Sequence, residues 1–419
     1  MNAILHGNQD VVVLSPTGSG KTLAYLLPVS QLVDAADDEP QAIVVTPGRE
    51  LALQSATVLK NMGSGLRAMA CYGGRAAMDE HRMMKQVRPQ IIFGTPGRLN
   101  DHLDKGNFSP YHIKYLIIDE FDKCLEMGFQ DEMSRLIKKL PGLRRHFLLS
   151  ATEAEEIPRF VHMGRVDKID YRMDEEQVPD RVHIYKVESP VKDKLESLGL
   201  LLRSLGDQST IVFLNYRDSV ERTNKYLVEQ GFSTSFFHGG LEQKEREASL
   251  YRFSNGSANI LVSTDLASRG LDIPDIDNII HYHIPESEDG YIHRVGRTAR
   301  WEAHGRAFFL LGPEEHIPEY VDSEVEVYEV PSADELPQPA KPRMATLYIG
   351  KGKKDKISKG DILGFLCKKG GLNSSEIGKI DVNDRYAYAA IARTKLRSVL
   401  NNVKGEKIKG VKTIVEEVR

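Results

Sequence analysis

A glycine-rich stretch between an apolar run and a helical pattern limits what this chain can fold into. Residues 15–22 read Ser-Pro-Thr-Gly-Ser-Gly-Lys-Thr, directly after the apolar residues 11–14 and before the helical pattern of residues 23–27. Glycines in such a loop let successive backbone N–H groups converge on an anion, and the N-terminus of the next helix adds positive charge. The sequence therefore predicts a phosphate-binding loop rather than an ordinary glycine turn. Lys21 is expected to reach the terminal phosphates and Thr22 the accompanying Mg²⁺. The expected nucleotide contacts in this loop are Ser15, Thr17, Gly18, Ser19, Gly20, Lys21 and Thr22.

Short apolar segments alternate with helical patterns in two successive series. This alternation predicts two parallel sheets covered by helices, in two similar α/β lobes. At 419 residues the chain is too long for one ordinary core. The predicted strands of the first series are 11–14, 42–45, 69–71, 90–93, 115–118 and 146–149, and those of the second are 182–187, 210–214, 234–237, 259–262, 278–282 and 307–311.

The C-terminal part differs in composition and in rhythm. Residues 344–419 contain 17 Lys/Arg and 8 Asp/Glu, a net charge of +9, whereas the rest of the chain carries −13. Its pattern predicts the order β-α-β-β-α-β, with the last strand over residues 412–417. Many small RNA-recognition modules share this order. We expect a third domain that binds a polyanion; a basic domain without that function is the alternative.

These features predict three domains and two connections. We expect the first lobe over residues 1–172, a linker over 173–181, the second lobe over 182–329, a spacer over 330–343 and the C-terminal domain over 344–419. The spacer contains Pro331, Pro337, Pro339 and Pro342, which favour an extended conformation.

Composition narrows the class of protein further. No apolar run approaches the roughly 18 residues of a membrane span, and the first residues do not form a secretory signal. The three cysteines, Cys71, Cys124 and Cys367, are scattered and lack metal-ligand spacing. We therefore expect a monomeric protein of the reducing cytoplasm that does not bind membranes.

Paired acids end the fifth predicted strand of the first series. Residues 115–118 are followed at once by Asp119, Glu120, Phe121 and Asp122. Carboxylates at the carboxyl end of a parallel strand can hold Mg²⁺ and orient a water molecule. We expect Asp119 to contact the metal through water and Glu120 to act as the base or water-positioning group; a solvated acidic loop is the alternative.

In their order, these and further motifs resemble those of DEAD-box RNA helicases. The first lobe matches at residues 15–22, 47–52 (Pro-Gly-Arg-Glu-Leu-Ala), Gly73-Gly74, 95–98 (Thr-Pro-Gly-Arg), 119–122 and 150–152 (Ser-Ala-Thr). The second matches at 238–240 (His-Gly-Gly) with Gln243 and Arg246, at 263–272 (Ser-Thr-Asp-Leu-Ala-Ser-Arg-Gly-Leu-Asp) and at 293–300 (His-Arg-Val-Gly-Arg-Thr-Ala-Arg). The C-terminal domain resembles the DbpA-type RNA-binding domain at 350–356, 360–364 and 377–380.

The resemblance implies ATP and Mg²⁺ as ligands and assigns further roles. Arg297 and Arg300 would stabilise the transition state once the lobes close, which for an arginine is worth about a thousandfold or more in rate. His293 would lie near the attacking water and Asp272 near the ribose. The hydroxyls of Ser150 and Thr152 would bond Asp122, and these three residues would couple nucleotide state to RNA. The expected RNA contacts are Arg49, Gly73, Gly74, Thr95, Arg98, Gly239 and Thr264, with Lys351, Lys353, Lys354 and Lys356 in the C-terminal domain.

Other interpretations of these residues stay open at this point. Arg294, Arg297 and Arg300 could form a solvated basic face. Ser150 with Thr152 could be the ordinary cap of a helix over residues 153–161. Tyr348, Tyr386 and Tyr388 fall on predicted strands of the C-terminal domain, where they would stack on bases or simply pack.

The chain departs from the family pattern at its start and at three positions. The adenine-contacting motif that precedes the first strand in the family is missing, which leaves open whether the start is truncated. Gly48 stands where threonine is usual, Phe121 where alanine is usual and Ala299 where glycine is usual. Glycine at position 299 would allow a backbone shape or close approach that alanine does not. Slow or unusually regulated turnover is one possible consequence.

We expect an RNA-dependent ATPase that opens short RNA duplexes or remodels RNA–protein structures. The C-terminal domain would tether it to a structured RNA, with ribosomal RNA the first candidate. Two alternatives are a weakly catalytic or non-catalytic RNA-binding clamp or RNA chaperone, and a DNA-directed helicase.

Overall fold

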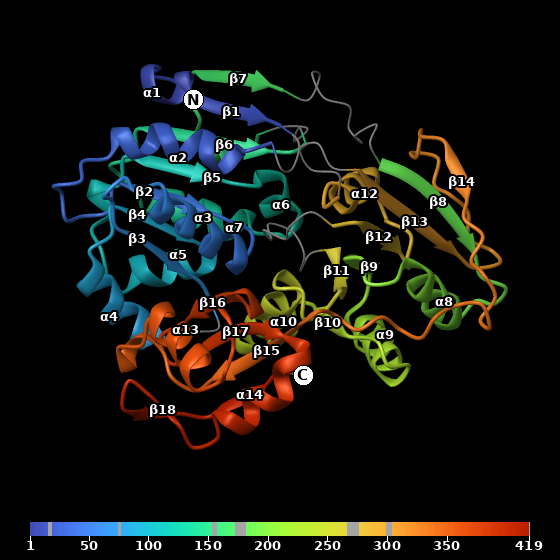
Figure 1. Ribbon diagram of the computed structural model, residues 1–419. Coiled ribbons are helices and arrows are strands. Elements are labelled where there is room, and N and C mark those ends of the chain that lie inside the picture. The colour runs from blue at the N-terminus through green and yellow to red at the C-terminus, as the bar shows by residue number, and fades with distance from the viewer. Residues whose placement is uncertain are drawn as a thin grey trace. The chain divides into compact units, whose positions relative to one another are not determined.

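The computed structural model describes residues 1–15, 19–73, 77–152, 157–171, 182–265, 276–298 and 304–418 (Figure 1). These residues form two compact units, which divide between residues 171 and 182. Thr17, Gly18, Gly74, Asp272, Ala299 and Arg300, all singled out from the sequence, lie outside the described residues. No helix in the described ranges has both the length and the apolar character that a membrane crossing needs.

The first unit is a parallel sheet of seven strands in the order β3-β4-β2-β5-β6-β1-β7. The strands are β1 (Asp10–Leu14), β2 (Ala42–Val45), β3 (Ala68–Cys71), β4 (Ile91–Gly94), β5 (Tyr115–Ile118), β6 (Arg145–Ser150) and β7 (Val166–Asp170). The α-helices are α1 (Asn2–His6), α2 (Lys21–Leu32), α3 (Arg49–Asn61), α4 (Ala77–Val87), α5 (Pro96–Asp104), α6 (Phe121–Glu126) and α7 (Gln130–Lys138).

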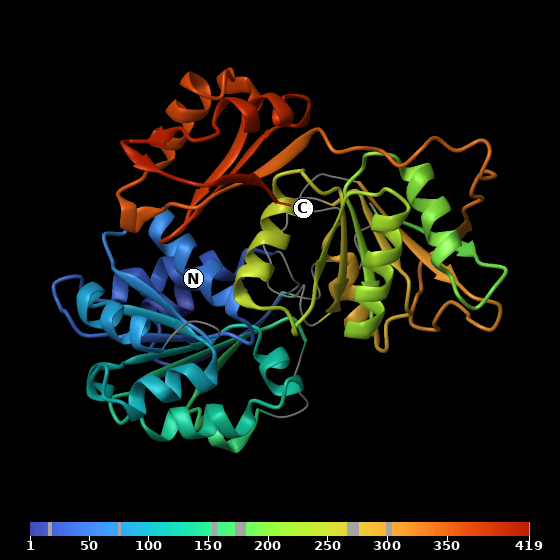
Figure 2. The ribbon, with the colours of Figure 1, turned by 90° about the horizontal axis from the view of Figure 1, so that it is seen from below.

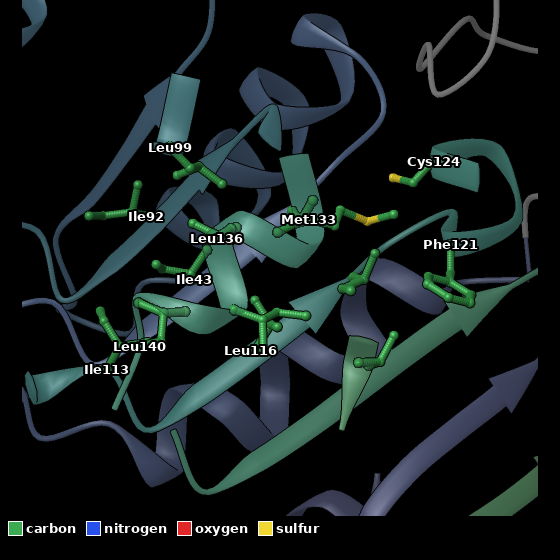
Figure 3. Packing of buried hydrophobic residues seen from close by; sticks show 14 of the residues in the cluster. Ile43, Ile92, Leu99, Ile113, Leu116, Phe121, Cys124, Met133, Leu136 and Leu140 are labelled. Carbon is green, nitrogen blue, oxygen red and sulfur yellow. The ribbon is translucent and has the colours of Figure 1, made fainter. Parts of the chain in front are cut away.

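Alternate residues of the central strands in this sheet enter two separate cores. In β2, Ile43 and Val45 join one apolar cluster, and Ala42 and Val44 join the other. This follows from the two-residue period of a strand. Helices α5 and α7 pack on the first face, where Leu99, Met133 and Leu136 meet β2 and β5 (Figure 3), and α2 and α3 pack on the second. Both faces are therefore covered, as an all-parallel sheet requires.

Within the second unit, the second lobe repeats this architecture strand for strand. Its order is β10-β11-β9-β12-β13-β8-β14, which is the order of the first sheet with every number raised by seven. The strands are β8 (Val182–Glu188), β9 (Thr210–Leu214), β10 (Thr234–Phe237), β11 (Ile260–Thr264), β12 (Asn278–His281), β13 (Gly305–Leu311) and β14 (Val325–Val327). The described helices are α8 (Leu195–Leu205), α9 (Arg217–Glu229), α10 (Gln243–Ser254) and α12 (Glu288–Val295). The predicted fold class, two parallel-sheet α/β lobes, is confirmed.

The C-terminal domain, also part of the second unit, is a four-stranded antiparallel sheet in the order β16-β17-β15-β20. Figure 2 shows its two helices on one side of the sheet. The elements are β15 (Met344–Ile349), α13 (Lys359–Lys368), β16 (Ile377–Val382), β17 (Ala387–Ala392), α14 (Leu396–Asn402), β18 (Lys407–Ile408), β19 (Val411–Lys412) and β20 (Val415–Glu417). The predicted β-α-β-β-α-β order is present.

One strand prediction in this domain was wrong in detail. Residues 412–417, expected as a single strand, divide between β19 and β20, and β19 pairs with β18 in a small hairpin. The hairpin turns at Lys409 and Gly410, whose φ angles are 52° and 81°. Two successive positive φ angles define the tight hairpin turn that matches strand twist.

Candidate nucleotide and RNA sites

The phosphate loop begins where β1 ends. Gly20 caps α2 with φ 86° and ψ 17°, a left-handed conformation that favours glycine. The Lys21 ammonium donates to the carbonyl of Ser15 at 2.5 Å, and the Ser15 hydroxyl donates to that of Ser19 at 2.5 Å. The backbone N–H of Ser15 donates to the carbonyl of Ser150 at 3.0 Å, which ties the loop to β6. Lys21 thus starts a helix whose N-terminus can receive an anion.

Asp119, at the end of β5, is the buried acid of this site. Its side chain accepts from the Tyr25 hydroxyl at 3.2 Å and from the N–H of Glu120 at 3.0 Å. Burial raises the pKa of Asp119, and the nearby charge of Lys21 opposes that effect. A bound cation would favour the charged form of this carboxylate. The oxygen atoms of Asp119 and Thr22 are ligands that fit Mg²⁺. The contact of Tyr25 with Asp119 was not predicted from the sequence, because a tyrosine on an amphipathic helix usually packs in the core.

Glu120 occupies an uncommon backbone conformation. It caps α6 with φ 52° and ψ 54°, one of the few positive φ values at a non-glycine residue among the described residues. The left-handed region costs a non-glycine residue about 1–2 kcal/mol. Strain of this kind tends to be kept where function needs the geometry.

Phe121, which replaces the usual alanine, lies in the first core beside Cys124 (Figure 3). It is 2% exposed. The larger side chain is therefore accommodated by the core on one face of the sheet. In this structure, Asp122 keeps its predicted partner despite the substitution.

Thr152 connects Asp122 to the end of β6. The Asp122 carboxylate accepts from the Thr152 hydroxyl at 2.9 Å and from its N–H at 3.3 Å. Ser150 was expected to reach Asp122 as well, but its hydroxyl donates to the Thr152 carbonyl at 2.6 Å. Ser150 therefore holds Thr152, and Thr152 alone of the two donates to the acid. The expected cap of residues 153–161 begins outside the described residues.

We expect Thr152→Val to uncouple hydrolysis from duplex opening. The change removes the 2.9 Å hydrogen bond, and the other Asp122 oxygen is already buried without a partner among the described residues. The oxygen that loses this bond keeps only the 3.3 Å bond from the N–H of residue 152. The loss of a hydrogen bond to a charged group costs about 1.5–3 kcal/mol. Unwinding of a short duplex should fall about tenfold while RNA-stimulated ATP hydrolysis stays within about threefold. Thr57→Val, at an exposed helix position, is the control; equal loss of both activities would contradict the coupling role.

Arg98 of the first lobe is held by acids. Its Nε donates to Glu80 at 2.7 Å and its Nη1 to Asp101 at 3.3 Å. His102 Nε2 lies 3.0 Å from the same Glu80 oxygen. Burial alone would raise the pKa of Glu80, but hydrogen bonds from His102 and Arg98 outweigh it and lower the pKa. Glu80, which the sequence motifs did not indicate, orients Arg98.

The other expected RNA contacts of the first lobe begin helices or follow strands. Arg49 is the first residue of α3, and Thr95 precedes α5 as its cap. Gly73 lies two residues after β3, and a Cβ there would come within 3.7 Å of Arg49 Nη2. Backbone groups and small residues at such positions can approach a sugar–phosphate chain closely.

In the second lobe, Arg294 is the centre of a buried polar network. Its guanidinium makes two bonds to the Asp265 carboxylate, of 2.6 and 2.7 Å. It also donates to the His283 carbonyl at 2.6 Å and to the Asn215 side chain at 2.8 Å. Burial, reinforced by the charge of Arg294, lowers the pKa of His281 well below its ordinary value. Arg294 therefore links α12 to the segment after β11.

His293 and Arg297 flank Arg294 and are also buried, with exposed fractions of 6% and 2%. A solvated basic face is therefore wrong for Arg294 and Arg297. Gly239 follows β10, and Thr264 ends the neighbouring parallel strand β11, so both lie at the carboxyl edge of the sheet. Ligands bind at this edge in open α/β sheets.

The lysines of the C-terminal domain surround one short turn. Lys353 and Lys354 are exposed in the 3₁₀ turn of residues 353–355, and Lys351 pairs with Asp355 at 3.1 Å. Lys409, from the β18–β19 hairpin, donates to the Lys356 carbonyl at 3.1 Å. The hairpin therefore places Lys409 next to Lys356, one of the lysines expected to bind RNA.

Comparison with known proteins agrees with this geometry. Family models match at residues 1–160 (DEAD/DEAH box helicase), 193–302 (helicase conserved C-terminal domain) and 346–417 (DbpA RNA binding domain). The chain is similar to the ATP-dependent RNA helicase DbpA of Escherichia coli, with 36% identity over 97% of this chain and 90% of the relative. It is 31% identical to DbpA of Bacillus subtilis, over 96% and 90%. Saccharomyces cerevisiae Dbp5 bound to RNA and ADP BeF3 matches with a TM-score of 0.69 and 26% identity, over 79% of this chain and 88% of that one. The chain therefore belongs to the DEAD-box family of ATP-dependent RNA helicases and ends in a DbpA RNA-binding domain.

Proposed function

We propose that this DEAD-box helicase hydrolyses ATP at the first-lobe site in response to RNA and uses that cycle to open short duplexes within a structured RNA. The observation that carries the proposal is the convergence of Lys21, Asp119 and Glu120 at one edge of one sheet, next to the Asp122–Thr152 pair. A cation, a carboxylate for the metal and a carboxylate for the water suit a nucleoside triphosphate.

Each residue has a definite part in this proposal. Lys21 and the N–H groups that begin α2 hold the phosphates, and Thr22 with Asp119 would hold Mg²⁺, which when bound neutralises phosphate charge. Glu120 accepts a proton from the attacking water or orients it. Arg297 and Arg300 stabilise the charge that develops on the transferred phosphoryl group. His293 acts near the water and Asp272 at the ribose.

RNA binding is proposed to have two parts. Arg49, Gly73, Gly74, Thr95 and Arg98 of the first lobe, with Gly239 and Thr264 of the second, contact the sugar–phosphate backbone without reading bases. The basic loop of the C-terminal domain, Lys351, Lys353, Lys354 and Lys356, tethers the enzyme to its target. We take ribosomal RNA as the first target to test, with the protein acting as a monomer in the cytoplasm.

The test compares ATP hydrolysis with no RNA, with an unstructured single strand and with fragments of ribosomal RNA. RNA-stimulated turnover with one fragment effective at far lower concentration than the single strand supports the proposal. If phosphate release does not respond to any RNA, the enzyme proposal fails and a non-catalytic clamp remains. Matched DNA strands, added as competitors, separate RNA from DNA specificity.

Charge reversal at Lys353 and Lys354 is expected to weaken capture of the structured RNA about tenfold at moderate salt, because both ammonium groups are exposed beside the hairpin lysines. Basal ATP hydrolysis should not change. The control is Lys60→Glu with Lys138→Glu, an equal charge change at exposed helix positions of the first lobe. Equal weakening by both double variants, measured by fluorescence anisotropy, would show general electrostatics rather than a tether.

A further inference from the structure

The sheet of the C-terminal domain has one face that does not belong to its core. Cross-strand pairing places Asp381 opposite Tyr388, Tyr388 opposite Tyr348, and Tyr348 opposite Glu416, in one row across all four strands. Opposed residues of a sheet share a face. The neighbouring positions Leu347 and Ala389 belong to the domain's apolar core on the other face. The tyrosine row, Asp381, Tyr388, Tyr348 and Glu416, therefore forms a second surface with an acid at each end.

Helix α10 of the second lobe covers the tyrosine row. The rings of Tyr251 and Tyr388 stack with centroids 5.0 Å apart and an interplanar angle of 28°. The Lys244 ammonium lies 5.0 Å from the centroid of the Tyr348 ring. The hydroxyl of Tyr251 donates to the carbonyl of Lys379. Burial raises the pKa of Tyr251 and of Tyr388, as expected for phenols enclosed by protein.

Polar groups close the edge of this contact. Thr346, 1% exposed, accepts from the Asn255 side chain at 2.9 Å and lies 2.5 Å from the Ser257 hydroxyl. The Arg393 guanidinium donates to the Ser257 carbonyl at 3.2 Å. Thr346 lies on the same face as the row, two positions before Tyr348. The contact thus combines aromatic stacking with satisfied hydrogen bonds, as specific interfaces do.

Helix α10 also carries Gln243 and Arg246, the motif residues that follow Gly239 in the chain. On α10, Gln243 donates to Glu247 at 3.0 Å, and Glu247 accepts a hydrogen bond from the Tyr386 hydroxyl. Arg246 lies over the Phe237 ring, 4.9 Å from its centroid, against the lobe's own sheet. One side of α10 therefore packs on the helicase lobe and the other on the C-terminal domain.

We propose that the tyrosine row is an intramolecular docking surface for α10 and not a base-stacking platform. An RNA-binding sheet needs exposed aromatic faces with cations for the phosphates; this row is covered by α10 and ends in carboxylates at Asp381 and Glu416. Docking gives the basic loop and the β18–β19 hairpin a fixed position relative to α10. This helix begins shortly after Gly239, an expected RNA contact of the second lobe. RNA captured by the domain is then held at a set distance from the helicase motifs; this last step rests on the proposed RNA tether.

The first experiment is hydroxyl-radical footprinting of the full chain without RNA. We expect Tyr388 and Tyr251, which are 2% and 5% exposed, to react at least fivefold more slowly than Tyr111, which is 73% exposed. Tyr388→Ala should raise the reactivity of Tyr251 severalfold, because its stacking partner is gone. Tyr386→Phe removes only the hydroxyl that reaches Glu247 and serves as the variant that preserves the sheet. It should give a smaller rise in the same direction.

The second experiment measures affinity for the structured RNA. Tyr388→Ala should change it less than about twofold, whereas loss of a stacked base costs about five- to a hundredfold. Fast reaction of both Tyr251 and Tyr388 without RNA, with protection only after RNA is added, would overturn the docking surface and identify a base platform. Failure of every RNA to bind would instead remove the tether and leave the footprinting result standing. Tyr111→Ala is the control for both readouts.

Discussion

Glu120→Gln is expected to reduce RNA-stimulated ATP hydrolysis by about a hundred- to ten-thousandfold, the range that a positioned acid–base group contributes. The amide keeps the size of the side chain and the left-handed backbone at φ 52°, but it cannot take a proton from water. Binding of nucleotide and of RNA should be retained, because Lys21 and Asp119 are unchanged. Steady-state phosphate release together with RNA anisotropy measures both quantities.

Asp131→Asn is the matched control, because Asp131 is an exposed acid in the first turn of α7 in the same lobe. It should leave turnover within about twofold. If Glu120→Gln hydrolyses ATP at the parent rate, Glu120 is not the group that handles the water, and the catalytic assignment of this site fails. If RNA binding is lost with turnover, the residue acts on assembly instead.

Much of each parallel sheet could be predicted because its strands are buried on both faces. Strands such as residues 42–45 and 210–214 form continuous runs of apolar or β-branched residues, and the structure has them at those bounds. Strands β7 and β14, each at one edge of its sheet, were not predicted. Strand β7 carries Asp167, Lys168 and Asp170, and β14 places Glu326 between two valines; the side chains of both strands are exposed or half-buried. Strands this exposed bury too little apolar surface to leave a strong pattern. The opposite edge strands, β3 and β10, bury more of their residues and were predicted.

The site could be predicted where neighbouring residues in the chain carry it. Lys21 and the acids 119–122 stand in local motifs whose spacing implies their geometry. Glu80, which orients Arg98 from another helix, and Asn215, which accepts from Arg294, occur outside any such motif. Their roles depend on which elements the fold brings together, and a single sequence does not contain that information.

The tyrosines of the C-terminal domain show the same limit more sharply. Alternation along β15 and β17 predicts which residues share a face, and it does so correctly for Tyr348 and Tyr388. It does not say what covers that face. Tyr251 lies 137 residues away from Tyr388 in the chain, on a helix whose pattern gives no sign of a partner beyond its own lobe. A sequence pattern therefore does not predict which surfaces of two domains pack together.

Arg294→Ala is expected to destabilise the second lobe by about 3–5 kcal/mol, the cost of breaking a buried ion pair by removing one partner. The substitution removes the guanidinium that donates hydrogen bonds to the Asp265 carboxylate and to the Asn215 side chain. It also removes a guanidinium that lies 5.3 Å from the centroid of the Phe213 ring. Hydrogen exchange of β9 and β11 in increasing urea, measured on the full chain, reports the local free energy of unfolding.

The exposed pair of Arg222 with Asp193, 2.5 Å apart, provides the control because it joins the same two residue types in the same lobe. Arg222→Ala should cost less than about 1 kcal/mol, since a solvated pair gains little. Arg294→Lys should recover less than half of the loss, because one ammonium cannot make the paired bonds to Asp265 together with those to His283 and Asn215. Equal effects of Arg294→Ala and Arg222→Ala would mean that burial contributes nothing to the network. In that case Arg294 would have to act on a ligand instead of on the fold, and Arg294→Ala would lower ATP hydrolysis without changing hydrogen exchange.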